Sequence, residues 1–284
     1  MDTKSRGKNR HMKADVKNVL CGLVLSIAVF CGKQEQVRLI VDFSSQREWR
    51  YTLTVDLRGV IAAPDTQRDF STNAQCCLLG TPVAGQAAML HVRACSVSVA
   101  APLLSDAEKI NLIRQCNDAQ FTVNVGKGTI IPDDPADMPL VKIGEWDLYK
   151  DVAKVLPALP QGRVRKGFSW DREKQIPLET KQGSAMGHLF QSFTLDSVFT
   201  DRRASRMALV SWRFTYGVEV KSADTAGRLG DVPSKGSGQG AALLNISDKT
   251  LEKASIHFSV PSTRQGKISI SWKEDIELTR EKVN

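Results

Sequence analysis

Cysteine is the residue type in this chain whose spacing points most directly to chemistry. The six cysteines are Cys21, Cys31, Cys76, Cys77, Cys95 and Cys116, and none of them has the C-x-x-C or Cys/His spacing of a zinc site. Four remain if the first 32 residues are removed, and an even number of thiols in an oxidising compartment predicts disulfides. Because adjacent Cys76 and Cys77 rarely bond to each other, we expect each to pair with Cys95 or Cys116. Four buried free thiols are the alternative.

The first 32 residues decide whether the chain meets an oxidising compartment. A basic leader runs into the apolar stretch Val19–Phe30, and this order is typical of a secretory signal peptide. The stretch is shorter than the roughly 20 apolar residues of a comfortable membrane span. We therefore predict export, with residues 1–32 acting as a signal peptide or as an uncleaved N-terminal membrane anchor.

Cys31 follows the apolar stretch directly, in the sequence Ala28-Val-Phe-Cys31. It resembles the acceptor cysteine of bacterial lipoproteins, which is acylated after the signal peptide is cleaved. The resemblance implies lipidation of Cys31 and a membrane-anchored, periplasm-facing protein of the bacterial cell envelope. The sequence departs from the lipoprotein pattern at Phe30, where a small residue is usual. Ser26-Ile-Ala28 offers a second cleavage site, which would leave no lipid.

Catalytic motifs are absent from the sequence. The histidines are scattered, and the chain contains no H-E-x-x-H, no G-x-S-x-G and no Walker loop. Asp133, Asp134 and Asp137 lie in a proline-rich loop that lacks the spacing of a calcium loop, so we expect a solvated acidic loop there. We predict a protein that is not an enzyme, with no catalytic residues, no metal and no cofactor.

The distribution of charge argues against nucleic acid as a partner. The formal net charge is +8, and about half of this excess lies in residues 1–18. The remaining chain is too weakly charged for its length to predict a phosphate-binding surface.

Alternation of apolar and polar residues is the dominant pattern of the chain. The longest example is the apolar series Ala208, Val210, Trp212, Phe214, Tyr216, Val218 and Val220, with polar residues between most of its members. Period two with one polar face predicts an antiparallel sheet that is covered on one side. We predict about ten strands on this rule. Glycine-rich segments such as Gly126–Gly128 and Lys235–Gly240 are predicted to be turns between them.

Two helical segments interrupt the strands. Ser105 and Glu108 form a capping-box pattern at the start of a helix near 105–116, and a second helix near 145–156 stops before Pro157. The fold class is therefore mainly β: a curved antiparallel sheet or half-barrel meander with two covering α-helices. The proline-rich loop after residue 131 favours two β lobes, 33–131 and 132–284.

Six aromatic residues fall on the predicted apolar face: Phe193, Trp212, Phe214, Tyr216, Phe258 and Trp272. A curved sheet could enclose an apolar ligand with them. An ordinary packed core is the alternative.

Residues 144–278 resemble a known group of proteins, and two short segments of this part show the resemblance. They are Leu156-Pro-Ala-Leu-Pro160 and Val164-Arg-Lys-Gly-Phe-Ser-Trp170, and a glycine-marked strand follows them. This part resembles a group of uncharacterised bacterial envelope lipoproteins with an L-P-x-x-x-V-x-x-G-x-x-W segment and a β-meander. The resemblance implies an envelope protein and brings no known activity.

Two functions from different classes remain open on the sequence. The first is a non-catalytic exported envelope protein, bound to the membrane through its N-terminus, that binds an apolar ligand or an envelope protein partner. The second is a periplasmic hydrolase with a carboxylate-based site that no motif reveals. An apolar pocket would favour the first, and a carboxylate–histidine pair in a cleft would favour the second.

Overall fold

The structure is a computed structural model that describes residues 35–102, 104–117, 119–131, 142–143, 146–180, 183–220, 235–265 and 268–281. The chain divides into two compact units, 1–36 and 37–284. The predicted signal peptide, with Cys21 and Cys31, lies outside the described residues, and so does the acidic loop with Asp133, Asp134 and Asp137.

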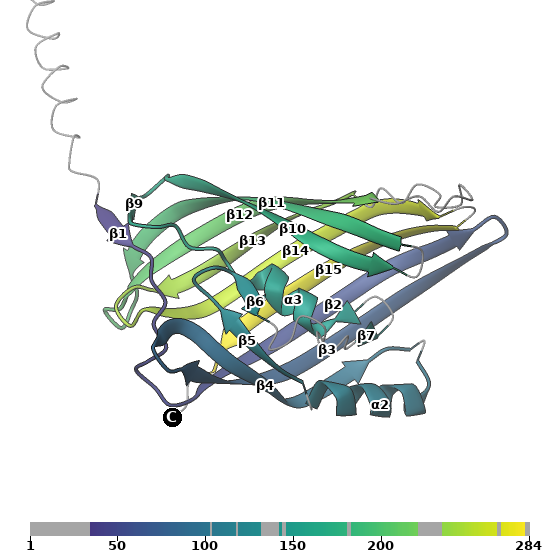
Figure 1. The fold of residues 1–284 in the computed structure, drawn as a ribbon, viewed down its shortest axis with the longest axis horizontal. Coiled ribbons are helices and arrows are strands. Elements are labelled where there is room, and N and C mark those ends of the chain that lie inside the picture. Colours follow the sequence, from purple (N-terminus) through teal and green to yellow (C-terminus); the bar gives the residue numbers. More distant parts are fainter. Residues whose placement is uncertain are drawn as a thin grey trace, which may run out of the picture. The chain divides into compact units, whose positions relative to one another are not determined.

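One antiparallel sheet of 11 strands dominates the second unit (Figure 1). Its order is β10 (Ser169–Thr180), β11 (Gly183–Thr200), β12 (Arg206–Val220), β13 (Lys235–Asn245), β14 (Thr250–Gln265), β15 (Ile268–Arg280), β2 (Trp49–Ala63), β3 (Thr66–Val83), β4 (Gln86–Ala100), β5 (Gln120–Asn124) and β6 (Thr129–Ile131). The sheet is not closed, because β10 and β6 are its two edges. Two small sheets pair β1 (Gln36–Arg38) with β9 (Arg163–Arg165) and β7 (Lys142–Ile143) with β8 (Trp146–Asp147).

Pairing of β15 with β2 joins the two lobes that the sequence favoured. The partners run from Ser269↔Ala62 to Arg280↔Tyr51, so the C-terminal strand lies along the first long strand of the chain. Residues 37–284 accordingly form one compact unit with no boundary near residue 132. Strand pairing between distant segments leaves no local sequence signal, so the sequence alone does not predict this contact.

The two faces of the sheet follow the predicted alternation. In β12, Val210, Trp212 and Phe214 are buried, whereas Arg213 and Thr215 are exposed. In β2, the buried residues are Trp49, Tyr51, Leu53, Val55 and Leu57. We call the side of the buried residues the inner face and the opposite side the outer face. Period two therefore identified correctly which side chains form the core.

Both predicted helices are present, with a later start for the second. α2 (Asp106–Asn117) begins with the expected capping box, in which the Ser105 amide donates to the Glu108 carboxylate at 2.8 Å. α3 (Leu148–Val155) starts three residues after the predicted 145, because Trp146 and Asp147 belong to β8. Leu148, Val152 and Val155 are buried on the side of α3 that packs on the sheet. No helix within the described residues has the length and apolar character needed to cross a membrane.

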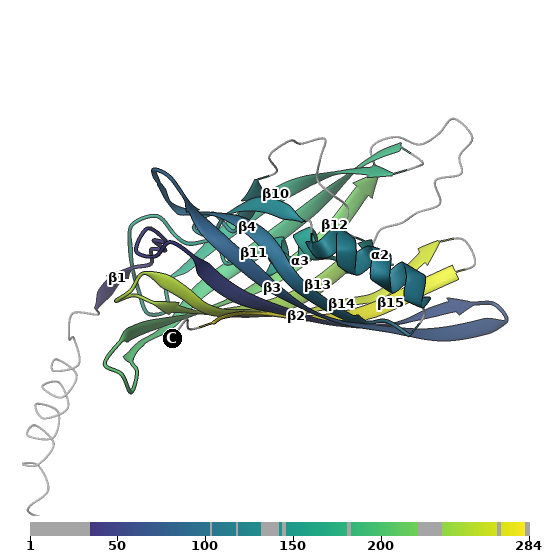
Figure 2. The same ribbon diagram turned by 90° about the horizontal axis from the view of Figure 1, so that it is seen from below.

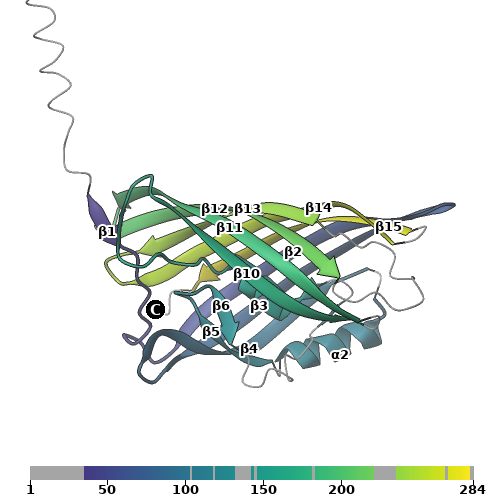
Figure 3. The ribbon, with the colours of Figure 1, turned by 45° about the horizontal axis from the view of Figure 1, so that its top comes forward.

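Curling of the sheet brings its two edges to the same side as α3, as Figures 1, 2 and 3 show. The segment after α3 connects these edges. The Leu159 amide donates to the Gly126 carbonyl in the β5–β6 turn at 3.0 Å, and the Trp170 indole on β10 donates to the Ala158 carbonyl at 2.9 Å. The Leu-Pro segment of the lipoprotein resemblance thus lies between β5–β6 and β10, where direct strand pairing is missing.

A row of glycines corrects the prediction for Lys235–Gly240. This segment is not a turn but the first half of β13. Gly236, Gly238 and Gly240 alternate on the inner face, and a Cβ on any of them would collide with the ring of Phe258, Phe214 or Trp212, respectively. Because every second residue in this part of β13 is glycine, aromatic rings from β12 and β14 can lie flat on the strand. From composition alone, a glycine-rich strand cannot be distinguished from a flexible glycine-rich turn.

Candidate functional site

The predicted aromatic set is brought together on the inner face. Phe193, Trp212, Phe214 and Phe258 are at most 5% exposed, and Tyr216 and Trp272 are half-buried against them. Ring centroids of Phe193 and Trp212 lie 5.5 Å apart, and those of Phe214 and Phe258 lie 5.6 Å apart. These distances are typical of stacked and tilted aromatic pairs in a packed interior. The set is therefore part of the core, and a ligand would reach it only if a covering element moved.

A buried charged cluster lies between α3 and this aromatic face. Lys154 Nζ lies 3.0 Å from Asp151 Oδ1 on the same helix and 2.6 Å from Glu274 Oε2 on β15. The two carboxylates are only 1% and 2% exposed, while the lysine side chain is 30% exposed. Lys154 Nζ also lies 5.6 Å from the centre of the Phe258 ring. We call Asp151, Lys154 and Glu274 the α3 ion cluster.

Burial shifts the pKa values of the α3 ion cluster. It raises the pKa of Asp151 well above the ordinary value; the Lys154 ammonium opposes this shift and the nearby Glu274 carboxylate adds to it. Burial lowers the pKa of Lys154, but the two carboxylates more than offset this and the net shift is upward. Burial of two carboxylates with one ammonium favours uptake of a proton by Asp151, because a neutral cluster costs less to remove from water.

Sequence analysis missed this cluster, although a signal was present. Trp272, Glu274, Ile276 and Leu278 alternate along β15, so the glutamate occupies a position that the pattern assigns to the inner face. A charged residue at an inward position of a strand indicates a buried partner. The identity of that partner, Lys154 on a separate helix, depends on the tertiary structure.

A small apolar cavity lies beside the same helix. It encloses about 30 Å³ and is lined by Val152 and Leu156 from α3 and its C-terminal end, and by residues of the sheet that include Tyr51, Leu90 and Leu278. The space is close to that of one water molecule, but its lining is entirely apolar. Packing between α3 and the inner face is thus incomplete at this point.

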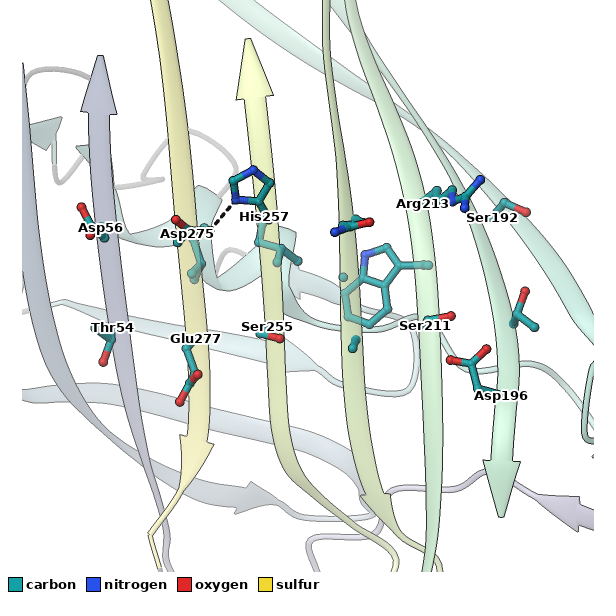
Figure 4. A pocket seen from close by; sticks show the side chains of 17 residues that line it. Thr54, Asp56, Ser192, Asp196, Ser211, Arg213, Ser255, His257, Asp275 and Glu277 are labelled. Carbon is teal, nitrogen blue, oxygen red and sulfur yellow. Dashed lines mark hydrogen bonds and ion pairs between the residues drawn. The ribbon is translucent and has the colours of Figure 1, made fainter. Parts of the chain in front are cut away.

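The outer face carries a separate, polar hollow of about 830 Å³ (Figure 4). Six strands contribute to it, namely β2 and β11 to β15. Side chains in the middle of the hollow are short, because Ser211 pairs with Ala241 and Ala241 pairs with Ser255 on the neighbouring strands. Longer polar side chains of the next row, Arg213 and His257 among them, border it.

A histidine–carboxylate pair is the main chemical feature of this hollow. His257 Nδ1 lies 2.5 Å from Asp275 Oδ1, and both side chains are about half exposed. Asp56 is bound by Arg58 and Glu277 by Lys253, so two of the other carboxylates in the hollow also have partners. Among the described residues, no serine or threonine hydroxyl hydrogen-bonds to the His257 imidazole. The hollow therefore has an oriented base but no nucleophile in contact with it.

The four cysteines outside the leader are free thiols in the structure and lie on different faces. Cys76 and Cys116 are buried on the inner side, whereas Cys77 is half-buried and Cys95 is exposed. Within the described residues, no group of three or more histidine, cysteine, aspartate or glutamate side chains could hold a metal ion.

Comparison with known proteins identifies no family. No family model and no curated protein matches the chain. Among solved structures, OccK11 (OpdR) of Pseudomonas aeruginosa matches with a TM-score of 0.24 and 6% identity over 87% of this chain and 98% of the other. OpdL of the same organism gives a TM-score of 0.23 and 7% identity over 84% and 99%. A LolA superfamily protein, NE2245 from Nitrosomonas europaea, gives 0.14 and 9% over 86% and 90%. We infer nothing about function from likenesses at these TM-scores.

Proposed function

We propose that this chain is an exported, non-catalytic envelope protein that binds an apolar ligand between α3 and the inner face of its sheet. The observation that carries the proposal is the α3 ion cluster, which places two buried carboxylates and a lysine where α3 meets the aromatic face. The ligand would occupy the space that α3 fills in the structure described here.

Charges are an unusual way to fasten a helix onto an apolar surface. Replacing a buried ion pair by well-packed apolar residues is often neutral or stabilising, so charge is not needed for stability alone. An attachment through Lys154 can be released by water or by a change in ionisation, whereas apolar contacts cannot. We therefore interpret α3 as a cover that leaves the inner face when a ligand enters.

The apolar cavity supports the same location. It lies where Val152 and Leu156 meet the sheet, so movement of α3 would enlarge a space that already has an apolar lining. The glycine row adds a flat aromatic floor nearby, formed by Trp212, Phe214 and Phe258. Flat rings offer a large contact area to an alkyl chain or a ring system.

Export and membrane anchoring belong to the proposal through the N-terminus. The basic leader, the apolar stretch Val19–Phe30 and Cys31 motivate a periplasm-facing protein held on the membrane. An apolar ligand in the envelope would then be bound close to a membrane surface.

Titration with the neutral apolar probe N-phenyl-1-naphthylamine tests the binding proposal. The double variant Lys154→Met/Glu274→Gln removes the ionic bridge without leaving an unpaired buried charge, because Asp151 is neutral when protonated. We expect it to bind the probe about tenfold more weakly than the wild type, since an apolar side chain at position 154 holds α3 on the inner face by contacts that water and ionisation do not release.

A matched control exists on the other helix. Asp106 and Lys109 of α2 form an ion pair with the same three-residue spacing as Asp151 and Lys154, but on the surface. The variant Asp106→Asn/Lys109→Met should bind the probe like the wild type. Equal affinities for all three proteins, or no binding by any of them, would contradict the proposal.

The His257–Asp275 pair supports a second candidate function, a hydrolase on the outer face. Asp275 would orient the imidazole, and His257 would act as a general base toward water. Hydrolysis of p-nitrophenyl acetate tests this function. Wild-type activity that is lost in His257→Gln and kept in Lys154→Met/Glu274→Gln would favour it. Equal background rates for all three proteins would exclude the pair as a catalytic site for this ester and leave the binding proposal in place.

A further inference from the structure

We propose that Cys77 and Cys95 are a disulfide-forming site on the outer face of the β3–β4 pair. The thiols are free in the structure, and their placement selects one of the pairings that the sequence leaves open. The inference concerns the covalent chemistry of the sheet and does not depend on the proposed ligand.

A β-bulge places the two cysteines next to each other. Leu78 pairs with Ala94 and Cys77 pairs with Ser96, so Cys95 is the extra residue of β4 between two consecutive pairs. A bulge leaves its extra residue without a ladder partner of its own and changes the direction of its side chain. The Cys95 thiol donates to the Cys77 carbonyl oxygen at 3.3 Å, and the Cys95 side chain is close enough to the Cys77 thiol to raise its pKa.

The other two thiols are on the opposite side of the sheet. Cys76 is 1% exposed on the inner face, and Cys116 of α2 is fully buried and close enough to affect the pKa of Cys76. Because Cys76 and Cys77 point to opposite faces, Cys76 cannot reach Cys95 without rotation of the strand. The fold therefore separates the four thiols into an outer pair, Cys77 with Cys95, and an inner pair, Cys76 with Cys116.

Reactivity differs between the two members of the outer pair. Burial and then the side-chain interaction with Cys95, which favours the protonated Cys77 thiol, raise the pKa of Cys77 to about 12, while the Arg50 guanidinium acts in the opposite direction. Cys95 is exposed and so meets an external oxidant first. Exposure and thiolate character govern attack on a disulfide. Cys95 is thus the attacking thiol and Cys77 the resolving thiol.

The oxidant is a disulfide, supplied by a small molecule or by another protein. The Cys95 thiolate attacks one sulfur of this disulfide, which forms a mixed disulfide and releases one thiol. The Cys77 thiolate then attacks the Cys95 sulfur, which forms the Cys77–Cys95 bond and releases the second thiol. Two cysteine thiols are oxidised, one disulfide is reduced to two thiols, and the two cysteine protons pass to the released thiolates.

Peptide mapping of the folded full-length chain tests the pairing. The chain is treated with oxidised glutathione, alkylated, digested with trypsin without reduction and analysed by mass spectrometry. Trypsin separates peptide 69–93, which contains Cys76 and Cys77, from peptide 94–109 with Cys95 and peptide 115–127 with Cys116. We expect a link between 69–93 and 94–109 that persists in Cys76→Ser and falls at least tenfold in Cys77→Ser.

The Cys77→Ser variant also provides a positive signal. Without a resolving thiol, the first step should stop at the mixed disulfide, so peptide 94–109 should carry glutathione in this variant. A link from 69–93 to 94–109 that survives in Cys77→Ser, or a link from 69–93 to 115–127 in its place, would overturn the proposal. Absence of any link and of any glutathione on 94–109 would overturn it as well.

Discussion

Asp151 is the side chain whose ionisation should matter most to stability. Its raised pKa means that the folded protein holds this proton to a higher pH than the unfolded chain does. The resulting stabilisation is fully present below the ordinary pKa of an aspartate and is lost as the pH rises through the folded-state pKa. Lys154, Glu274 and Tyr216 are the titratable groups nearest to it or to its lysine partner.

Asp151→Asn isolates this effect, because asparagine resembles the protonated acid and does not titrate. We expect the wild type to lose stability relative to the variant from about pH 4 upward, by at most about 1.4 kcal/mol per pH unit. Urea unfolding of both proteins between pH 4 and 8 measures the difference. Parallel curves over this range would mean that Asp151 is ionised in the folded state at every pH tested.

At the scale of the element, β12 offers the clearest test of the two faces. Trp212→Ala or Phe214→Ala removes a large buried ring and should lower the free energy of unfolding by about 3–5 kcal/mol. Arg213→Ala or Thr215→Ala changes an exposed side chain on the same strand and should alter it by about 0.5 kcal/mol or less. Chemical denaturation of the four variants checks this contrast. Similar losses on both faces would show that the outer face is covered.

The glycine row predicts an unusual sensitivity to a single methyl group. A Cβ at Gly240 would collide with the Trp212 ring, so Gly240→Ala should destabilise the protein by about 1–3 kcal/mol, the range for overpacked cores. Gly217→Ala on the neighbouring strand is the control, since its Cβ would meet no atom within 4 Å. Thermal unfolding of the two variants should separate them clearly. Equal effects would show that the ring can move aside.

At the scale of the whole molecule, the proposal of a lipid anchor at Cys31 predicts where the protein is found in the cell. If Cys31 is acylated, the wild type should fractionate with membranes and incorporate labelled lipid, and Cys31→Ser should lose the label and move to the soluble periplasmic fraction. An unlabelled wild type that stays with membranes would instead indicate an uncleaved anchor. Wild-type protein in the cytosol would contradict export.

Local patterns in the sequence determined much of the architecture. Period-two alternation identified the inner and outer faces of β2 and β12, since successive side chains of a strand point to opposite sides. The Ser105–Glu108 capping box located the start of α2, because it satisfies amides of the first helical turn within four residues. Both signals are local and depend on no distant contact.

Only the tertiary structure decided how these elements combine. Pairing of β15 with β2, the glycine row against rings of β12 and β14, and the meeting of Lys154 with Glu274 all join residues far apart in the chain. The sorting of Cys77 with Cys95 depends on a one-residue bulge that shifts the register of β4. Such contacts follow from packing of the whole sheet, and the local sequence carries no record of which partner each residue will meet.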